Sequence, residues 1–171
     1  MPTITINAAA ETDIPAIESV YADVVGWLER QGYVQWTKER VSWAGLTGHF
    51  GYRLEDFYIA SLDGAVAGCM VLMDRDPLFW PEIEKGRSLY IHKLAVKRFA
   101  AKKGVSAALL NFAKDEAARR GAAGLRLDTG ADRPKLREMY EDAGFVCVRQ
   151  NIMFGNYDVA YYVWTPEVEL G

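Results

Sequence analysis

Cysteine and histidine are both scarce in this chain of 171 residues, which contains two of each. Cys69 and Cys147 lie far apart, each in an apolar stretch typical of a strand. We therefore expect both thiols to be buried, reduced and chemically inert, as in a cytoplasmic protein. Because no cysteines and histidines cluster at the spacing of metal ligands, the sequence predicts no metal site.

The chain also lacks a strong net charge and any long apolar run. Its formal net charge of −3 gives no electrostatic footprint for nucleic acid. The longest apolar runs are far shorter than a membrane span, and the first residues lack the basic and apolar regions of a signal peptide. We expect a cytoplasmic protein that binds neither nucleic acid nor membrane.

The overall composition is that of an ordinary globular protein, with 50% hydrophobic and 25% charged residues. The length is sufficient for one domain with a sizeable core. Since the sequence shows no repeat, low-complexity segment or linker, we predict a single domain over residues 1–171.

The segment from Ser88 to Leu110 is the most informative part of the chain. Its first part, Ser88–Val96, is almost continuously apolar, which predicts a strand buried on both faces. The basic loop 97–103 follows, and Gly104 precedes a helix with apolar residues at helical spacing. This order points several backbone N–H groups and the positive end of a helix dipole at one place. It predicts an anion site, most often for phosphate, although an ordinary crossover with a solvated loop fits equally well.

The rest of the chain is expected to supply further strands and helices. Strands are predicted at residues 3–7, 57–62, 65–73, 124–129, 145–152 and 159–164, and helices at residues 13–31, about 38–48, 105–120 and 134–143. Asp63 and Gly64 predict a two-residue hairpin turn, and Gly68 predicts a bulge or a close backbone approach. The strand 124–129 follows a crossover helix, so we expect it to run parallel to Ser88–Val96.

The segment 101–106, with the sequence AKKGVS, resembles the acetyl-CoA pyrophosphate loop of the GNAT N-acetyltransferase superfamily. That loop usually reads Gln/Arg-x-x-Gly-x-Gly/Ala, after a Leu-Ala-Val strand and before an apolar helix, and both flanks match here. Ala101 and Ser106 depart from the pattern at its first and last positions. The first departure costs little if backbone amides bind the phosphates, and the Ser106 side chain is small with a hydroxyl that can donate.

The resemblance implies an α/β (α+β) fold with a mixed, mostly antiparallel central sheet flanked by helices. It also implies a splayed parallel pair of strands, between which the arm of acetyl-CoA enters. The family usually carries an asparagine seven positions before Tyr140, and Arg133 stands there instead, which puts that cofactor contact in doubt. The residues expected along the cofactor are Leu94, Ala95, Val96, Ala101, Lys102, Lys103, Gly104, Val105, Ser106 and Arg133. The backbone N–H of Leu94 or Ala95 is the implied oxyanion donor.

Tyr140 is the candidate general acid. The segment from Tyr140 to Phe145 resembles the GNAT signature Tyr-x-x-x-Gly-Phe, in which the tyrosine lies near the CoA sulfur. A phenol is protonated at neutral pH and can donate a proton or a hydrogen bond to a departing thiolate. The alternative is an ordinary core tyrosine on one face of its helix.

His92 is the candidate general base, because an imidazole titrates near neutral pH. The arylalkylamine N-acetyltransferases, which are similar here, carry a histidine at the matching place. Strand alternation would put His92 on the same face as Tyr90 and Leu94. Two alternatives remain open: a hydrogen-bonded histidine with no catalytic part, and a water held by Tyr90 that relays the proton. His49 is expected at the surface.

Two groups of apolar side chains remain without an assigned partner. Leu78, Phe79 and Trp80 lie in a loop, where they could cover the core, a dimer partner or a substrate. Four aromatic residues lie in the region that forms one wall of the acceptor site in GNAT proteins: Trp27, Tyr33, Trp36 and Trp43. We interpret most of them as packing residues and expect at least one to line the acceptor site.

The function that the resemblance implies is transfer of an acetyl group from acetyl-CoA to a primary amine, on a small molecule or a peptide, by direct attack in a ternary complex. A homodimer is a further expectation. Two alternatives are a non-catalytic CoA-binding sensor or interaction module, suggested by the departures at Ala101, Ser106 and Arg133, and a transferase of longer acyl groups.

Overall fold

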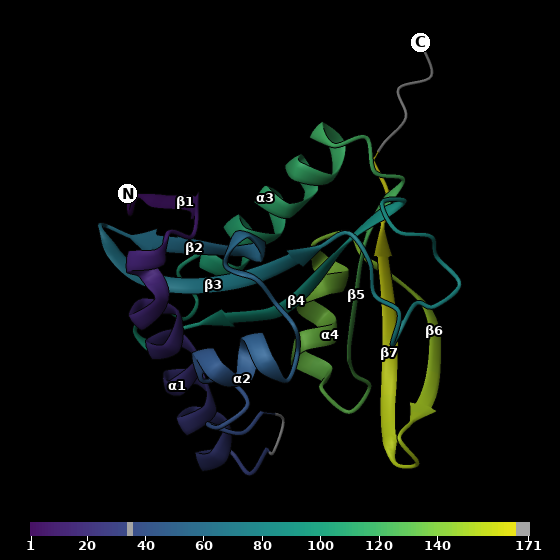
Figure 1. The fold of residues 1–171 in the computed structure, drawn as a ribbon, viewed down its shortest axis with the longest axis horizontal. Coiled ribbons are helices and arrows are strands. Elements are labelled where there is room, and N and C mark those ends of the chain that lie inside the picture. Colours follow the sequence, from purple (N-terminus) through teal and green to yellow (C-terminus); the bar gives the residue numbers. More distant parts are fainter. Residues whose placement is uncertain (34–35, 167–171) are drawn as a thin grey trace. The chain divides into compact units, whose positions relative to one another are not determined.

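A computed structural model describes residues 1–33 and 36–166 of the chain (Figure 1). The chain forms two compact units. Unit 1 comprises Met1–Leu72 and Lys93–Leu109, and unit 2 comprises Met73–His92 and the chain from Leu110 onward. The seven strands are hydrogen-bonded in the order β1-β2-β3-β4-β5-β7-β6, and β4 contributes residues to both units. The predicted mixed sheet is therefore confirmed, whereas the single domain over residues 1–171 stays a prediction.

Unit 1 contains a helix that buries one face. The helix α1 (Ile14–Arg30) follows the strand β1 (Ile4–Ala8), and Pro15 lies in its first turn. Its buried residues recur at helical spacing: Ile17, Val20, Tyr21, Val25 and Leu28.

The second helix, α2 (Trp43–Gly48), is shorter than the sequence predicts. We expected a helix over about residues 38–48, but turns occupy residues 38–41. Ser42 has an extended backbone, and its side chain accepts a hydrogen bond from the Gly45 amide. Because Ser42 caps the helix in this way, the helix cannot begin earlier.

The hairpin of β2 (Phe57–Leu62) and β3 (Ala65–Met73) confirms two predictions about glycine. Asp63 and Gly64 both have positive φ, as the turn requires. The β2–β3 register shifts between Ala60 and Ser61, next to Gly68. A Cβ added at Gly68 would lie 2.7 Å from the Ala95 carbonyl oxygen, so only glycine allows this close backbone approach.

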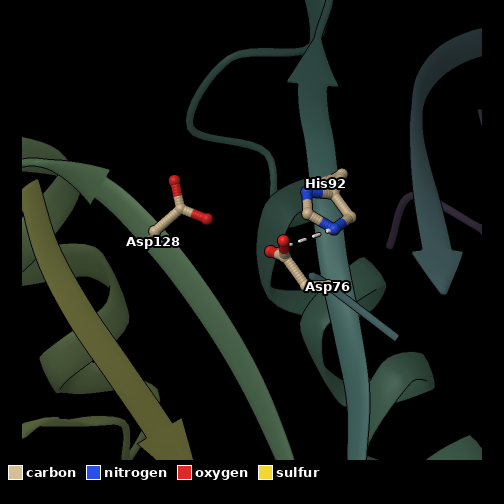
Figure 2. Close-up of side chains that lie close together, drawn as sticks. All are labelled: Asp76, His92 and Asp128. Atoms are coloured by element: carbon tan, nitrogen blue, oxygen red, sulfur yellow. Dashed lines mark ion pairs between the residues drawn. The ribbon is translucent and has the colours of Figure 1, made fainter. Parts of the chain in front are cut away.

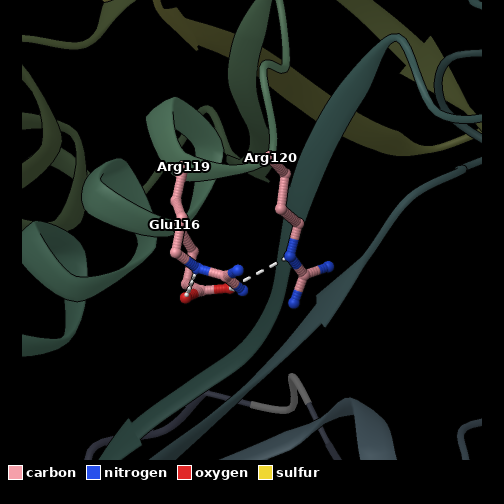
Figure 3. A network of polar contacts seen from close by, with 3 residues as sticks. All are labelled: Glu116, Arg119 and Arg120. Carbon is pink, nitrogen blue, oxygen red and sulfur yellow. Dashed lines mark hydrogen bonds and ion pairs between the residues drawn. The ribbon is translucent and has the colours of Figure 1, made fainter.

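Unit 2 contains β5 (Gly124–Gly130), α4 (Pro134–Asp142), β6 (Val146–Met153) and β7 (Tyr157–Trp164), together with most of the helix α3 (Val105–Arg119). The strand β7 pairs antiparallel with both β5 and β6, and it begins two residues earlier than predicted. The end of α3 carries a network in which the Glu116 carboxylate accepts from Arg119 and Arg120 (Figure 3). None of the helices in the described part of the chain is long and apolar enough to cross a membrane.

The parallel pairing of β4 (Ser88–Val96) with β5 is confirmed. It covers only three residues of each strand, from Ser88 opposite Gly124 to Tyr90 opposite Arg126. Both strands continue beyond this short ladder.

The loop before β4 contributes to the core of unit 2. Trp80 is buried together with Tyr90 and Tyr161, and Phe79 packs against this cluster. Leu78 is 54% exposed. Of the three interpretations of this loop, the core interpretation is thus right for Phe79 and Trp80 but not for Leu78.

The two cysteines differ in burial. Both are free thiols, and Cys69 is buried as expected. Cys147 is only half-buried, so the prediction of burial is wrong for this residue, which lies on the edge strand β6.

Candidate functional site

The loop 97–106 in unit 1 has the backbone of an anion-binding turn. Lys102 and Gly104 adopt positive φ values of 61° and 88°. The first intrahelical bond of α3 runs from the Ala108 amide to the Gly104 carbonyl, so the amides of the first turn are left for other partners. Lys102 and Lys103 are exposed, whereas Val105 is buried and anchors the helix. Backbone N–H groups, the helix dipole and two lysines thus suit a diphosphate.

Arg98 differs from the other basic residues of this loop. Its backbone amide donates to Asp23 Oδ2 at 2.8 Å, and its guanidinium lies 4.0 Å from the centre of the Trp27 ring. These contacts hold Arg98 on α1.

The strand that leads into this loop is interrupted at Lys93, which has a φ of +53°. The Lys93 carbonyl accepts a hydrogen bond from the Tyr21 hydroxyl at 2.8 Å. The expected alternation from Tyr90 through His92 to Leu94 therefore ends at Lys93, because alternation requires a continuously extended backbone. The proposed cofactor contacts of Leu94, Ala95 and Val96 lie after this interruption.

The aromatic residues of unit 1 are mostly engaged in packing. Trp36 meets the Tyr21 ring edge-on with a centroid distance of 5.8 Å, and Trp43 packs on Phe57 at 5.2 Å. Tyr33 is exposed. The packing interpretation thus accounts for Trp27, Trp36 and Trp43, and an acceptor-lining role for one of the four stays a prediction.

In unit 2, Tyr140 is 7% exposed and packs against Phe145 and Tyr162. Its helix α4 begins at Pro134, directly after Arg133. Burial raises the pKa of Tyr140, the negative charge of Asp128 raises that pKa further, and Arg133 lowers it. The phenol therefore remains protonated throughout the neutral range, as a proton donor must.

His92 faces a buried carboxylate that the sequence did not indicate. Its Nε2 atom lies 3.6 Å from Asp76 Oδ2 (Figure 2). Asp76 is 6% exposed, and its Oδ1 atom accepts hydrogen bonds from the amides of Leu78 and Phe79. Burial raises the pKa of Asp76, and these two amide hydrogen bonds lower it.

Asp128 brings a second carboxylate to this pair. It comes from β5, and Figure 2 shows its carboxylate pointing toward Asp76 and His92. One ligand atom from each of the three residues lies within 4.8 Å of the others. We call these three side chains the Asp–His–Asp cluster. They could hold either an organic cation or a metal ion.

Asp128 also connects this cluster to the proposed acid. In addition to its effect on Tyr140, it acts on Tyr157. Burial and the negative charges of Asp128 and Asp132 raise the pKa of Tyr157 to about 12.

Sequence reasoning missed Asp76 and Asp128. The one available signal was the position of Asp128 near the carboxyl end of a parallel strand, where ligands commonly bind in such sheets. Nothing in the sequence distinguishes Asp76 from other loop carboxylates.

Comparison with known proteins gives a consistent result. A family model described as the acetyltransferase (GNAT) family matches residues 21–145. A GNAT-family acetyltransferase from Listeria monocytogenes has a TM-score of 0.74 and 21% identity, over 95% of each chain. The Salmonella typhimurium protein yncA, whose structure contains acetyl-CoA, has a TM-score of 0.64 and 18% identity, over 98% of this chain and 96% of that chain.

A third similar structure, also from Salmonella typhimurium, is an acetyltransferase that modifies the N-terminal serine of a 50S ribosomal subunit protein. It has a TM-score of 0.67 and 18% identity, over 96% of each chain. A search of curated protein sequences finds no match. At these identities, the likeness to solved structures shows a shared fold.

Proposed function

Because the chain belongs to the GNAT family of acetyltransferases, we propose that it transfers an acetyl group from acetyl-CoA to a primary amine. The amine, on a small molecule or a peptide, attacks the thioester directly in a ternary complex. One observation carries the proposal: the charge of Asp128 acts on the protonated phenol of Tyr140, and the same carboxylate lies beside His92. Asp128 thus lies beside the candidate base, and its charge also acts on the candidate acid.

The cofactor contacts are proposed from the backbone of unit 1. Amides around Gly104, with Ala101, Lys102, Lys103, Val105 and Ser106, would hold the diphosphate, and the backbone of Leu94, Ala95 and Val96 would lie along the pantetheine arm. The positive φ values at Lys102 and Gly104 support this role, because they turn successive N–H groups toward one point. Arg133, half-buried at the start of α4, is a further candidate contact.

The chemistry requires three functions. The ammonium of the acceptor must lose a proton, which His92 takes directly or through a water. A backbone N–H of Leu94 or Ala95 would stabilise the tetrahedral oxyanion. The thiolate of CoA leaves as an anion, and the protonated Tyr140 would donate to it.

Two further features belong to this proposal. Both cysteines are free thiols, which supports a reducing, cytoplasmic location. The strand β6 lies at the edge of the sheet and exposes apolar side chains, which supports a homodimer. These side chains are Val146, Val148 and Ile152.

Release of CoA thiol with a panel of primary amines tests the function, with mass spectrometry of the product. In Tyr140→Phe, we expect turnover to fall by about 10²–10⁴-fold and the affinity for acetyl-CoA to stay within threefold. Tyr58→Phe is the matched control, since Tyr58 is 8% exposed but lies in unit 1. This control should keep full turnover.

Two results would contradict the proposal. Acetyl-CoA binding without turnover on any amine would favour the CoA-binding sensor, and faster turnover of propionyl- or succinyl-CoA would favour a longer acyl donor. Full activity of Tyr140→Phe would remove this residue from the mechanism.

A further inference from the structure

The Asp76 carboxylate is buried but only half satisfied. Its Oδ1 atom accepts two backbone amides, whereas its buried Oδ2 atom has no hydrogen-bond partner. The 3.6 Å separation from His92 Nε2 is too long for a hydrogen bond. Buried polar atoms without partners are rare in proteins and call for an explanation, of which a missing ligand is one.

A buried hydroxyl on β4 also interacts with the Asp76 carboxylate. Tyr90 is fully buried, and a hydrogen bond with the Ser88 side chain lowers the pKa of its hydroxyl. It lies two residues before His92, on the extended part of the strand that precedes Lys93. Burial raises the pKa of Tyr90, Arg126 lowers it, and the charge of Asp76 raises it, so that Tyr90 and Asp76 act on each other.

The size of the Asp–His–Asp cluster limits the ligands that it can hold. A metal such as Zn²⁺ binds oxygen and nitrogen atoms at about 2.0–2.1 Å, which places its ligand atoms roughly 3.4 Å apart in a tetrahedron. An ammonium nitrogen binds oxygen at about 2.8 Å, which places tetrahedral acceptors roughly 4.6 Å apart. The ligand atoms of the cluster lie within 4.8 Å of one another, and the Asp76–His92 distance is 3.6 Å. The 3.6 Å separation lies closer to the spacing of metal ligands, and the 4.8 Å limit also admits an ammonium group, which the proposed acetyl transfer supplies.

We propose that Asp76 and Asp128 bind the ammonium group of the acceptor beside His92, and that the protein thereby selects amines without an adjacent carboxylate over α-amino acids. The proposal rests on the proposed acetyl transfer and names its substrate class. An ammonium has three N–H donors and no acceptor. It can donate one to each carboxylate and direct the third at His92, which takes the proton.

The selectivity follows from charge. The carboxylate of an α-amino acid is two bonds from the amine, so it would lie within about 5 Å of two carboxylates of like charge. At an effective dielectric of about 20, their repulsion lowers the affinity by more than a hundredfold. The guanidinium groups of Arg126 and Arg149 lie over the Trp80 ring, but both have other partners. Arg126 donates to Ser88 Oγ, and Arg149 pairs with Glu82.

The test compares amines with the matching α-amino acids: 2-phenylethylamine with phenylalanine, and histamine with histidine. For each pair we measure kcat/KM for CoA release and, by calorimetry with CoA present, the acceptor affinity, using protein dialysed against EDTA. We expect the amine to be preferred by more than a hundredfold. Asp128→Asn should lower this preference at least tenfold without changing the affinity for acetyl-CoA, whereas Asp115→Asn, an exposed control on α3, should not.

Each outcome decides between the two proposals. Equal use of amines and α-amino acids, or an unchanged preference in Asp128→Asn, overturns the ammonium site and leaves the acetyl transfer intact. Amine binding that depends on Asp128 but is followed by no turnover retains the ammonium site and overturns the transfer. Absence of both binding and turnover overturns both. Stoichiometric Zn²⁺ binding that Asp128→Asn abolishes, with amine selectivity only when Zn²⁺ is present, shows a metal site and overturns the ammonium site.

Discussion

The loop 97–106 of unit 1 and the Asp–His–Asp cluster of unit 2 are built in opposite ways. The loop is one continuous segment whose binding groups are backbone amides, and its lysines are exposed. The cluster joins three side chains from a loop and two strands, and its Asp76 carboxylate is almost fully buried. A site made of backbone depends on local conformation, whereas a site made of side chains depends on tertiary structure. The two should therefore respond differently to substitution.

The largest effect is expected in the cluster, from His92→Asn. If His92 takes the proton of the acceptor, kcat/KM at neutral pH should fall by about 10²–10⁴-fold, the range for loss of a general base. The affinity for acetyl-CoA, measured by calorimetry, should not change. His49→Asn is the natural control, because His49 is the other histidine of the chain and is exposed. A loss below threefold in His92→Asn would leave the proton to another group, such as a water held by Tyr90.

An intermediate effect is expected in the loop, from Gly104→Ala. Gly104 has a φ of +88°, which costs a residue with a Cβ about 1–2 kcal/mol. If the protein relieves this strain by moving the loop, the amides leave their positions, and we expect the dissociation constant for acetyl-CoA to rise about tenfold.

Gly86→Ala makes this test specific. Gly86 has a φ of +86° and nothing within 4 Å of an added Cβ, so it carries the same backbone strain away from the loop. Thermal unfolding should show a similar loss of stability in both variants, but only Gly104→Ala should lose affinity. Equal losses of affinity in both would mean that general destabilisation, and not the loop, is being measured.

The contrast between the sites also explains what the sequence could and could not predict. The strands Phe57–Leu62, Ala65–Met73 and Ser88–Val96 were predicted with their observed bounds, because apolar patterns and the Asp63-Gly64 turn are local signals. The helix expected at about residues 38–48 was wrong at its start, since the Ser42 cap outweighed weak periodicity.

The site residues follow the same division. The loop around Gly104 could be proposed as a site because its motif is contiguous. Tyr140 could be proposed for the same reason, but the effect of Asp128 on its pKa could not be predicted. Asp76 and His92 are brought together by the fold of unit 2 and have no spacing that reveals their contact. The φ of +53° at Lys93 was equally hidden, since lysine rarely adopts it.

The smallest effect concerns the free energy of unfolding. It should differ between the buried charge of Asp76 and an exposed charge of the loop 97–106. Asp76→Asn keeps an oxygen that can accept from the Leu78 and Phe79 amides and removes the buried charge. Burial raises the pKa of Asp76 in the folded state, so the folded protein holds the proton more tightly than the unfolded chain does. The wild type is therefore most stable, relative to the variant, below the ordinary pKa of an aspartate, and it loses stability as the pH rises through the raised pKa.

We thus expect Asp76→Asn to match the wild type near pH 4 and to exceed it at pH 8, by about 1.4 kcal/mol for each unit by which the folded-state pKa is raised. Urea unfolding at the two pH values measures this difference. Lys103→Gln, which removes an exposed charge of the loop, should change stability by less than about 0.5 kcal/mol at either pH. If Asp76→Asn is instead less stable at pH 8, a positively charged His92 stabilises the Asp76 carboxylate, and the cluster is an ion pair before any acceptor binds.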